Sequence, residues 1–138
     1  MARTVHPKDP SGDRFSRGVA MAAGAVFLVF GAWAFLGPRS FFDAVAEFEP
    51  YNRHFIHDIG AFQIGLGATL VVAAFVRDGL VVALWGVGAG ATVHVLSHVI
   101  DHDHGGRPES DIPLFAIVAA LLLAAALMRT RRLRRPTD

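Results

Sequence analysis

The chain alternates between four long apolar segments and shorter polar ones. Each apolar segment is close to the roughly 20 residues that a helix needs to cross the hydrocarbon core of a bilayer. The segments cover residues 18–36, 53–76, 80–100 and 112–128. The pattern therefore predicts an all-α fold, a four-helix transmembrane bundle that occupies residues 18–130.

Polar residues flank this predicted bundle on both sides. Residues 1–17 contain Pro7, Pro10 and Gly12 among charged side chains, and we expect a disordered tail there. Residues 131–138 form a second, basic tail.

The first connection between apolar segments carries a short amphipathic stretch. Within residues 40–49, Phe41, Val45 and Phe48 recur at helical spacing, and acidic side chains separate them. Such a stretch favours a short helix that lies in the membrane interface. Pro50 ends it, because a proline ring clashes with the preceding helical turn.

Local signals set the limits of the later helices. Asn52 is a suitable N-cap for the second helix, and Ser110 or Asp111 can cap the fourth. Because the turn at 77–79 is short, the second and third helices are predicted to be antiparallel neighbours.

Composition supports the membrane class. Hydrophobic residues make up 53% of the 138 residues and charged residues 18%, whereas a soluble domain has about 45–50% apolar and about 25% charged residues. The chain has no cysteine, which excludes disulfides, thiolate metal sites and cysteine nucleophiles. The formal net charge of +1 indicates no particular partner.

The distribution of basic residues predicts the orientation. If both termini are cytoplasmic, ten basic residues lie inside and three, Arg39, Arg53 and Arg107, lie in the outer loops. The positive-inside rule favours this arrangement. The C-terminal arginines would anchor the fourth helix and bind anionic lipid headgroups. They are Arg129, Arg131, Arg132, Arg134 and Arg135. So short a run beside a membrane does not favour nucleic-acid binding.

Histidines gather toward the outer end of the predicted third helix. Gly86, Gly90, His94 and His98 recur every four residues, and Asp101 continues the line three residues later. At about 3.6 residues per turn they form one stripe. The glycines would allow a second helix to approach closely. His94 lies roughly 9 Å inside the helix end, at 1.5 Å per residue, a depth at which ionisable groups are costly.

The second helix carries a matching set of residues. His54, Asp58 and Gly65 share a face, and His57 lies to one side. Since this helix begins at the surface where the third one ends, the two sets are predicted to meet. The loop histidines, His102 among them, follow directly, so six of the seven histidines lie at one end of the bundle.

Two histidines one turn apart can bind one metal ion, and a facing helix can supply further ligands. Neutral imidazole suits zinc, iron, copper(II) and nickel, and an aspartate can also orient a ligand histidine. The predicted metal ligands are His54, Asp58, His94 and His98, with His57, Asp101 and His102 as second-rank candidates.

Three other interpretations fit the same residues. Haem b could be held by one histidine from each helix, for example His94 with His54 or His57. A cluster without metal could handle protons, since histidine titrates near neutral pH. A purely structural cluster would hold the helices together through hydrogen bonds.

The start of the second apolar segment resembles a pattern found in small bacterial membrane proteins with four helices, broadly like the DoxX-type group. The resemblance rests on Tyr51, Asn52, His54, Asp58 and Gly60. The HxxxH pattern of the third helix and the overall plan extend it to about half of the chain. It implies the four-helix architecture and a bacterial plasma membrane, and it implies no activity. The DoxX-type group is linked to redox partners, but no cysteine or quinone motif here supports that link.

These observations favour a membrane protein that binds a divalent metal ion (zinc, iron or copper) between the second and third helices. One alternative is a non-enzymatic accessory or scaffold subunit whose glycine-lined helices pack against a second copy or another membrane protein. A further alternative is an oxidoreductase component that uses haem or non-haem iron. A binding protein is favoured over an enzyme, because the chain shows no nucleophile–base pair and no phosphate-binding loop.

Overall fold

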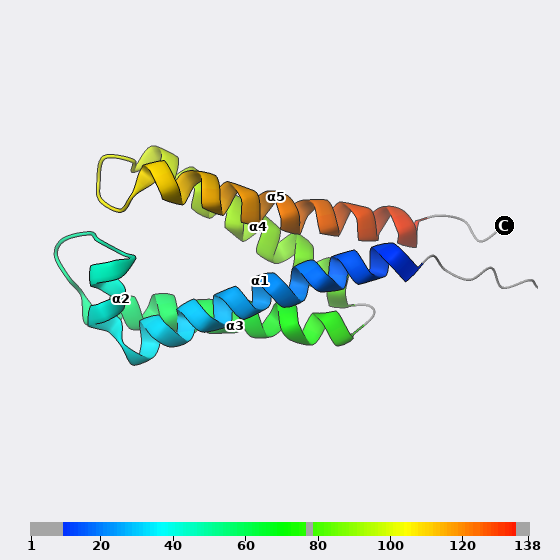
Figure 1. Cartoon of the computed structure of the whole chain (residues 1–138), viewed down its shortest axis with the longest axis horizontal. Coiled ribbons are helices and arrows are strands. Elements are labelled where there is room, and N and C mark those ends of the chain that lie inside the picture. The colour runs from blue at the N-terminus through cyan, green and yellow to red at the C-terminus, as the bar shows by residue number, and fades with distance from the viewer. Residues whose placement is uncertain (1–9, 77–78, 135–138) are drawn as a thin grey trace, which may run out of the picture.

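The computed structural model of the chain describes residues 10–76 and 79–134. These residues form five helices and no strand (Figure 1). The helices are α1 (Pro10–Leu36), α2 (Pro38–Ala44), α3 (Arg53–Phe75), α4 (Gly79–Ile100) and α5 (Pro108–Leu133). All except α2 are long and apolar enough to cross a membrane. The predicted all-α bundle of four long helices with one short additional helix is therefore confirmed.

Both outermost helices extend further into polar sequence than predicted. α1 begins at Pro10, so residues 10–17 are helical although they were predicted to be disordered. α5 begins at Pro108 and continues to Leu133, into the predicted basic tail. A proline at the first helical position has no backbone N–H to lose, which makes Pro108 a suitable helix start. The remaining tail residues, 1–9 and 135–138, and residues 77–78 of the predicted turn lie outside the described part.

The predicted cap of α3 is confirmed and that of α5 is wrong. Asn52 Oδ1 accepts a hydrogen bond from the backbone N–H of Phe55 at 3.1 Å. Arg107 is the N-cap of α5, and Ser110 and Asp111 lie inside its first turn. Pro108 causes this shift, because its fixed φ already suits a helix.

The short helix α2 starts earlier and is shorter than the predicted stretch at 40–49. Gly37 is its N-cap, Pro38 opens the first turn, and the helix ends at Ala44. Phe41 and Phe42 are both buried. α2 is thus held by apolar contacts with α1 and α3, which share its hydrophobic cluster.

The long helices pack as two antiparallel pairs, α1 with α3 and α4 with α5 (Figure 1). Gly24 and Gly31 of α1 lie against Gly67 and Gly60 of α3. A Cβ on any of them would come within 3.0 Å of the backbone of the other helix. Gly88 of α4 similarly faces leucine side chains of α5. Small residues at these positions let the helix axes approach, which is the main route to close packing in a membrane.

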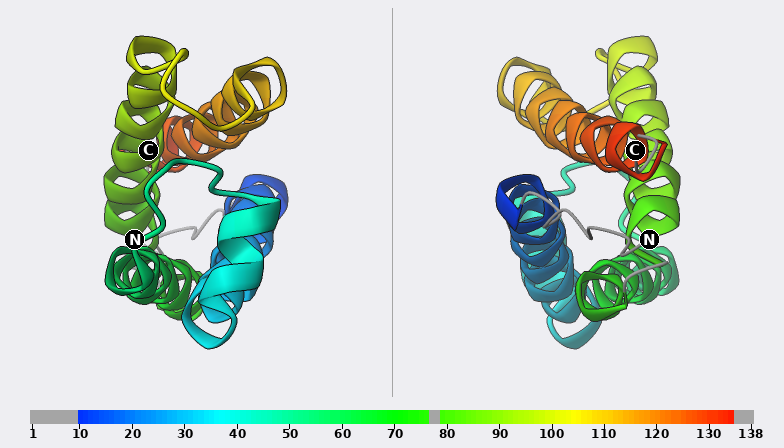
Figure 2. Two further views of the ribbon diagram at one scale, coloured as in Figure 1. Left: turned by 90° about the vertical axis from the view of Figure 1, so that its left-hand side faces the viewer. Right: turned by 90° about the vertical axis from the view of Figure 1, so that its right-hand side faces the viewer.

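The two pairs share a core over only half of their length. We call the half that contains residues 10–20 and 122–134 the terminal half, and the half that contains loops 45–52 and 101–107 the loop half. The terminal-half core takes residues from all four long helices, including Ala20, Leu70, Leu84 and Leu122. The loop-half core consists of Ala34, Phe41, Phe42 and Ile56, which belong to α1, α2 and α3. Toward the loop half the α4–α5 pair diverges from the α1–α3 pair (Figures 1 and 2).

Candidate functional site

His94 and His98 continue the series of core residues along α4. The core-facing positions recur at alternating steps of four and three, and they are Leu80, Leu84, Val87 and Ala91. The next positions in the series are His94, His98 and Asp101. Alternating steps of three and four keep residues on one side of a helix. The histidines therefore continue the core-facing side of α4 beyond the shared core, where His94 is exposed and His98 is half-buried.

The two imidazoles form a compact aromatic group with α5. The ring centroids of His94 and His98 lie 4.7 Å apart, with an edge-to-face interplanar angle of 89°. The ring of Phe115 lies 4.7 Å from His94 and 4.9 Å from His98. Among the described residues, neither imidazole has a hydrogen-bond or ion-pair partner. Their ring nitrogens are thus available to a ligand.

One carboxylate lies a helical turn away from this group along α5. Asp111 precedes Phe115 by four residues. Asp111 Oδ2 accepts a hydrogen bond from the backbone N–H of Arg107 at 2.9 Å, and Ser110 Oγ donates to Asp111 Oδ1 at 3.2 Å. Both of its oxygens are thus held at the start of α5, and within residues 10–76 and 79–134 Asp111 forms no ligand group with the two histidines.

His54 and Asp58 form a second, separate pair on α3. His54 Nε2 lies 3.7 Å from Asp58 Oδ2, and the two side chains are 87% and 51% exposed. Gly65 lies on the same face, and a Cβ there would meet no atom within 4 Å. Gly60, in contrast, faces α1. The histidine-bearing face of α3 is therefore turned away from the packed interior.

The second-rank candidates are also dispersed. His57 stacks on Phe35 of α1 with 5.1 Å between ring centroids. Asp101 and His102 lie exposed in the turn after α4. None of these three joins either pair in a larger ligand group within the described residues.

The loop after α4 also contains an exposed His–Asp contact. His104 Nδ1 lies 2.7 Å from Asp103 Oδ1. The pKa of Asp103 is lowered, first by a hydrogen bond from its own backbone N–H and then by the charge of His104. Both side chains are largely exposed, so this contact stands apart from the histidines of α4.

The structure does not bring the predicted four ligands together. Within residues 10–76 and 79–134, no three His, Cys, Asp or Glu side chains lie close enough to share a metal ion. The physical reason is the choice of partner for α3, whose glycines pack on α1 and not on α4. The short turn joins α3 to α4 in sequence, but it does not make them the closest pair. Gly86 and Gly90 likewise have no neighbouring atom within 4 Å of a built Cβ, so their predicted close contact is not formed within the chain.

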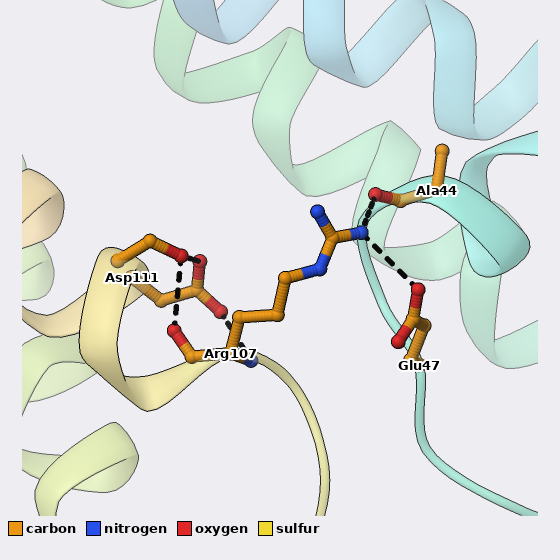
Figure 3. Close-up of polar contacts among 5 residues, drawn as sticks. Ala44, Glu47, Arg107 and Asp111 are labelled. Carbon is orange, nitrogen blue, oxygen red and sulfur yellow. Dashed lines mark hydrogen bonds and ion pairs between the residues drawn. The ribbon is translucent and has the colours of Figure 1, made fainter.

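A polar contact connects the two helix pairs in the loop half (Figure 3). The guanidinium of Arg107 donates to the backbone carbonyl of Ala44 and to Glu47 Oε1, the latter at 3.1 Å. The backbone N–H of Gly106 donates to the carbonyl of Glu47 at 3.1 Å. Gly105 and Gly106 adopt φ values of 119° and 73°, which glycine tolerates without steric cost. We call this contact the loop bridge.

The terminal half is closed by a second polar contact, between α1 and α5. Asp13 forms an ion pair with Arg129, whose side chain is 7% exposed. Ser16 Oγ donates to the carbonyl of Ala125 at 3.1 Å. Arg129 therefore holds helices together, and it is the exposed arginines beyond it, Arg131 and Arg134, that remain accessible at this end.

No family model, no curated protein and no solved structure matches the chain. The fold itself defines the class. Four helical segments of 22 to 26 residues have the length and apolar composition to cross a membrane, and the protein is a multi-pass membrane protein.

Proposed function

We propose that the protein binds a divalent metal ion in the loop half of the bundle, with His94 and His98 as its imidazole ligands. The observation that carries the proposal is the pair itself. The ring centroids of two imidazoles on consecutive helical turns lie 4.7 Å apart, next to Phe115. Neither imidazole has a hydrogen-bond partner in the described part of the chain. Histidines four residues apart on one helix can both reach a single ion.

The position of the pair supports a functional role for it. The series on α4 is otherwise apolar up to Ala91, and a leucine at 94 or 98 would continue it. An ionisable side chain within a membrane helix is costly, and such residues are generally retained for function. Within the bundle, His94 and His98 are therefore better explained by ligand binding than by packing.

The ligand chemistry favours borderline ions such as zinc, iron(II) and copper(II) over copper(I). Neutral imidazole nitrogen suits these borderline ions. The chain has no cysteine, so the soft thiolate ligands that favour copper(I) do not contribute. Haem b would need a histidine of α3, such as His54, to approach His94 from the other helix pair. His54 lies on the exposed face of α3.

We further propose that both termini are cytoplasmic, in a bacterial plasma membrane. Ten of the basic residues then lie inside and three outside, as the positive-inside rule requires. The metal site would face the outer leaflet, and the exposed C-terminal arginines would contact anionic lipid headgroups. A relation to the DoxX-type group stays a prediction that rests on residues 50–60 and the HxxxH of α4.

Metal analysis of the protein, purified in mild detergent without a histidine tag, tests the proposal. We expect near-stoichiometric zinc, iron or copper, and its loss in the variant His94→Ala/His98→Ala. The matched control is His54→Ala/His57→Ala, which removes two histidines of α3 and should leave the metal content unchanged. An unaltered metal content in His94→Ala/His98→Ala would rule the site out. A Soret band in the absorbance spectrum would show that the bound group is haem and not a simple metal ion.

A second candidate function is that of an accessory subunit that packs against another membrane protein or a second copy. The specific observation is that Gly65, Gly86 and Gly90 face open space, whereas a Cβ at Gly24, Gly31, Gly60, Gly67 or Gly88 would meet a neighbouring helix. Under this function Gly86→Leu/Gly90→Leu should abolish the assembly seen by chemical crosslinking in membranes. It should leave metal content as it is in the unaltered protein.

A further inference from the structure

One face of α3 is exposed along most of the helix. Its residues follow one another at alternating steps of four and three, which keeps them on one side of the helix. They are His54, Asp58, Ala61, Gly65, Ala68 and Val72, and all of them are exposed. We call this set the exposed face of α3. It lies on a different side of the helix from Gly60 and Gly67, which pack on α1.

The exposed face carries two ionisable side chains, and one of them lies at membrane depth. α3 has 23 residues, which at 1.5 Å per residue is about 5 Å longer than the hydrocarbon core of a bilayer is thick. Asp58 follows the first residue of α3, Arg53, by five positions, so it lies roughly 5 Å inside that core when the helix is centred. Its side chain is 51% exposed. Ionisable groups at this depth nearly always face the interior of an assembly and not lipid.

The contact between His54 and Asp58 leaves both groups with bonding capacity. His54 Nε2 lies 3.7 Å from Asp58 Oδ2, which is beyond hydrogen-bond distance. An ionised carboxylate accepts about four hydrogen bonds. A polar partner outside the single chain would therefore lower the cost of placing Asp58 in the membrane.

Small residues in the middle of the exposed face allow a second helix to come close. Ala61, Gly65 and Ala68 occupy this part, and a Cβ at Gly65 would meet no atom within 4 Å. Small residues four positions apart, such as Ala61 and Gly65, are typical of helix contacts in membranes, because they let two backbones approach. The exposed face thus combines room for a helix with ionisable groups that need a partner.

We propose that two copies of the chain associate through the exposed face of α3, related by a two-fold axis along the membrane normal. All copies have the same orientation in the bilayer, so the two α3 helices are parallel and like residues lie at the same depth. His54 and Asp58 are one turn apart, so the imidazole of each copy lies beside the carboxylate of the other. A two-fold contact requires such a self-complementary surface, whereas a different protein would have to supply its own acid and base at this depth.

The open glycines of α4 form a weaker candidate for the same contact. Gly86 and Gly90 also have open space, but the exposed side chains next to them, Val82 and Val93, are apolar. Lipid covers such a surface without cost, and it does not solvate the carboxylate on α3. The dimer is independent of the proposed metal site, and it assigns a surface and a partner to the assembly considered as the second candidate function.

Disulfide crosslinking of single-cysteine variants tests the proposal, since the chain has no cysteine of its own. The full chain is purified, reconstituted into vesicles of phosphatidylethanolamine and phosphatidylglycerol, and oxidised. We expect Ala68→Cys to form a product of twice the chain mass. The matched control is Leu66→Cys, which lies at a similar depth on another side of α3 and should form at least tenfold less of that product.

Two further changes in the Ala68→Cys background separate the small residues from the ionisable ones. Gly65→Leu should reduce the product at least tenfold, because it blocks the approach of the second helix. Asp58→Ala should reduce it at least threefold, and the exchange His54→Asp/Asp58→His should restore most of it, since complementarity is kept.

The outcomes are distinct. The Cβ position of Gly65 is open within one copy, so loss of product in Gly65→Leu reports association and not misfolding. Equal crosslinking of Ala68→Cys and Leu66→Cys, or a product that survives Gly65→Leu, would overturn the proposal. Loss of product in Gly86→Leu/Gly90→Leu alone would assign the contact to α4 instead. A chain that binds no metal but forms the Ala68→Cys product would refute the metal-binding function and leave the dimer standing.

Discussion

Single glycines decide how the membrane helices pair, and their positions matter more than their number. Gly60 and Gly67 touch the backbone of α1, whereas Gly65, between them in sequence, has open space at its Cβ position. All three lie in the same apolar segment. A methyl group is therefore damaging at two of these positions and harmless at the third.

This contrast predicts opposite effects for two substitutions in one helix. Gly67→Ala places a methyl group 2.8 Å from the carbonyl oxygen of Gly24, and overpacking of this kind costs about 1–3 kcal/mol of unfolding free energy. Gly65→Ala should leave stability unchanged or raise it slightly. Reversible unfolding in mixed micelles measures both. Equal losses for the two variants would contradict the close α1–α3 contact.

A buried charge at the terminal half gives a second prediction at the level of residues. Asp13→Asn removes a charge-assisted hydrogen bond to Arg129, a side chain that is almost fully buried. Hydrogen bonds to charged groups contribute about 1.5–3 kcal/mol, and we expect a loss of unfolding free energy in that range. The control is Asp43→Asn, which breaks the exposed pair with Arg39, a kind that contributes about 0–1 kcal/mol. A loss for Asp13→Asn no larger than that of the control would refute the structural role of this pair.

At the level of the helix, α4 is one continuous packing element with two different ends. Its core-facing series is apolar from Leu80 to Ala91 and changes to imidazole at His94 and His98. The change coincides with the level at which the α1–α3 pair leaves the shared core. α4 thus contributes to packing at one end and offers a polar, ligand-accessible surface at the other.

Replacement of both histidines separates these two roles. In His94→Leu/His98→Leu the apolar series simply continues against Phe115, and swaps of similar volume usually cost less than about 1.5 kcal/mol. We expect the unfolding temperature of the metal-free protein to be unchanged or higher, together with complete loss of bound metal. A large drop in stability of the metal-free variant would instead assign the histidines to a structural hydrogen-bond network.

At the scale of the whole molecule, two helix pairs are joined firmly at one end and lightly at the other. The terminal half has a core from all four long helices and the contact of Asp13 with Arg129. In the loop half the pairs diverge, and the loop bridge of Arg107 with Glu47 connects them (Figure 3). Exposed polar contacts of this sort are weak. The loop half is therefore the part of the bundle where the separation of the two pairs can change most easily.

Distances between spin labels test this asymmetry, and the absence of native cysteine makes labelling specific. Phe62→Cys/Val93→Cys reports the loop half, and Val72→Cys/Val82→Cys reports the terminal half. All four positions are exposed. We expect a longer distance for the first pair, and a broader distribution for that pair alone when Glu47→Gln is added. Equal distances at both ends would contradict the divergence of the helix pairs.

The pattern of apolar residues along the chain was enough to predict the class of the protein and the existence of its helices. Apolar length marks a membrane span whatever surrounds it, so α3 and α4 were predicted to within one residue at each end. The cap at Asn52 followed from local chemistry as well, since its hydrogen bond reaches only three residues along the chain. The ends of α1 and α5 were missed, because polar residues at a helix end give no periodic signal.

Which helices are close partners, and therefore which residues form the candidate site, depends on packing between helices and could not be predicted from the sequence. In a membrane, packing depends on which small residues meet, and the periodicity of one helix cannot tell which of its glycine-bearing faces will find a partner. The sequence predicted α3 beside α4 and therefore His54 and Asp58 beside His94 and His98. Because Gly60 and Gly67 pack on α1 instead, the α3 pair faces outward. The α4 histidines are left with α5, where Phe115 is their neighbour.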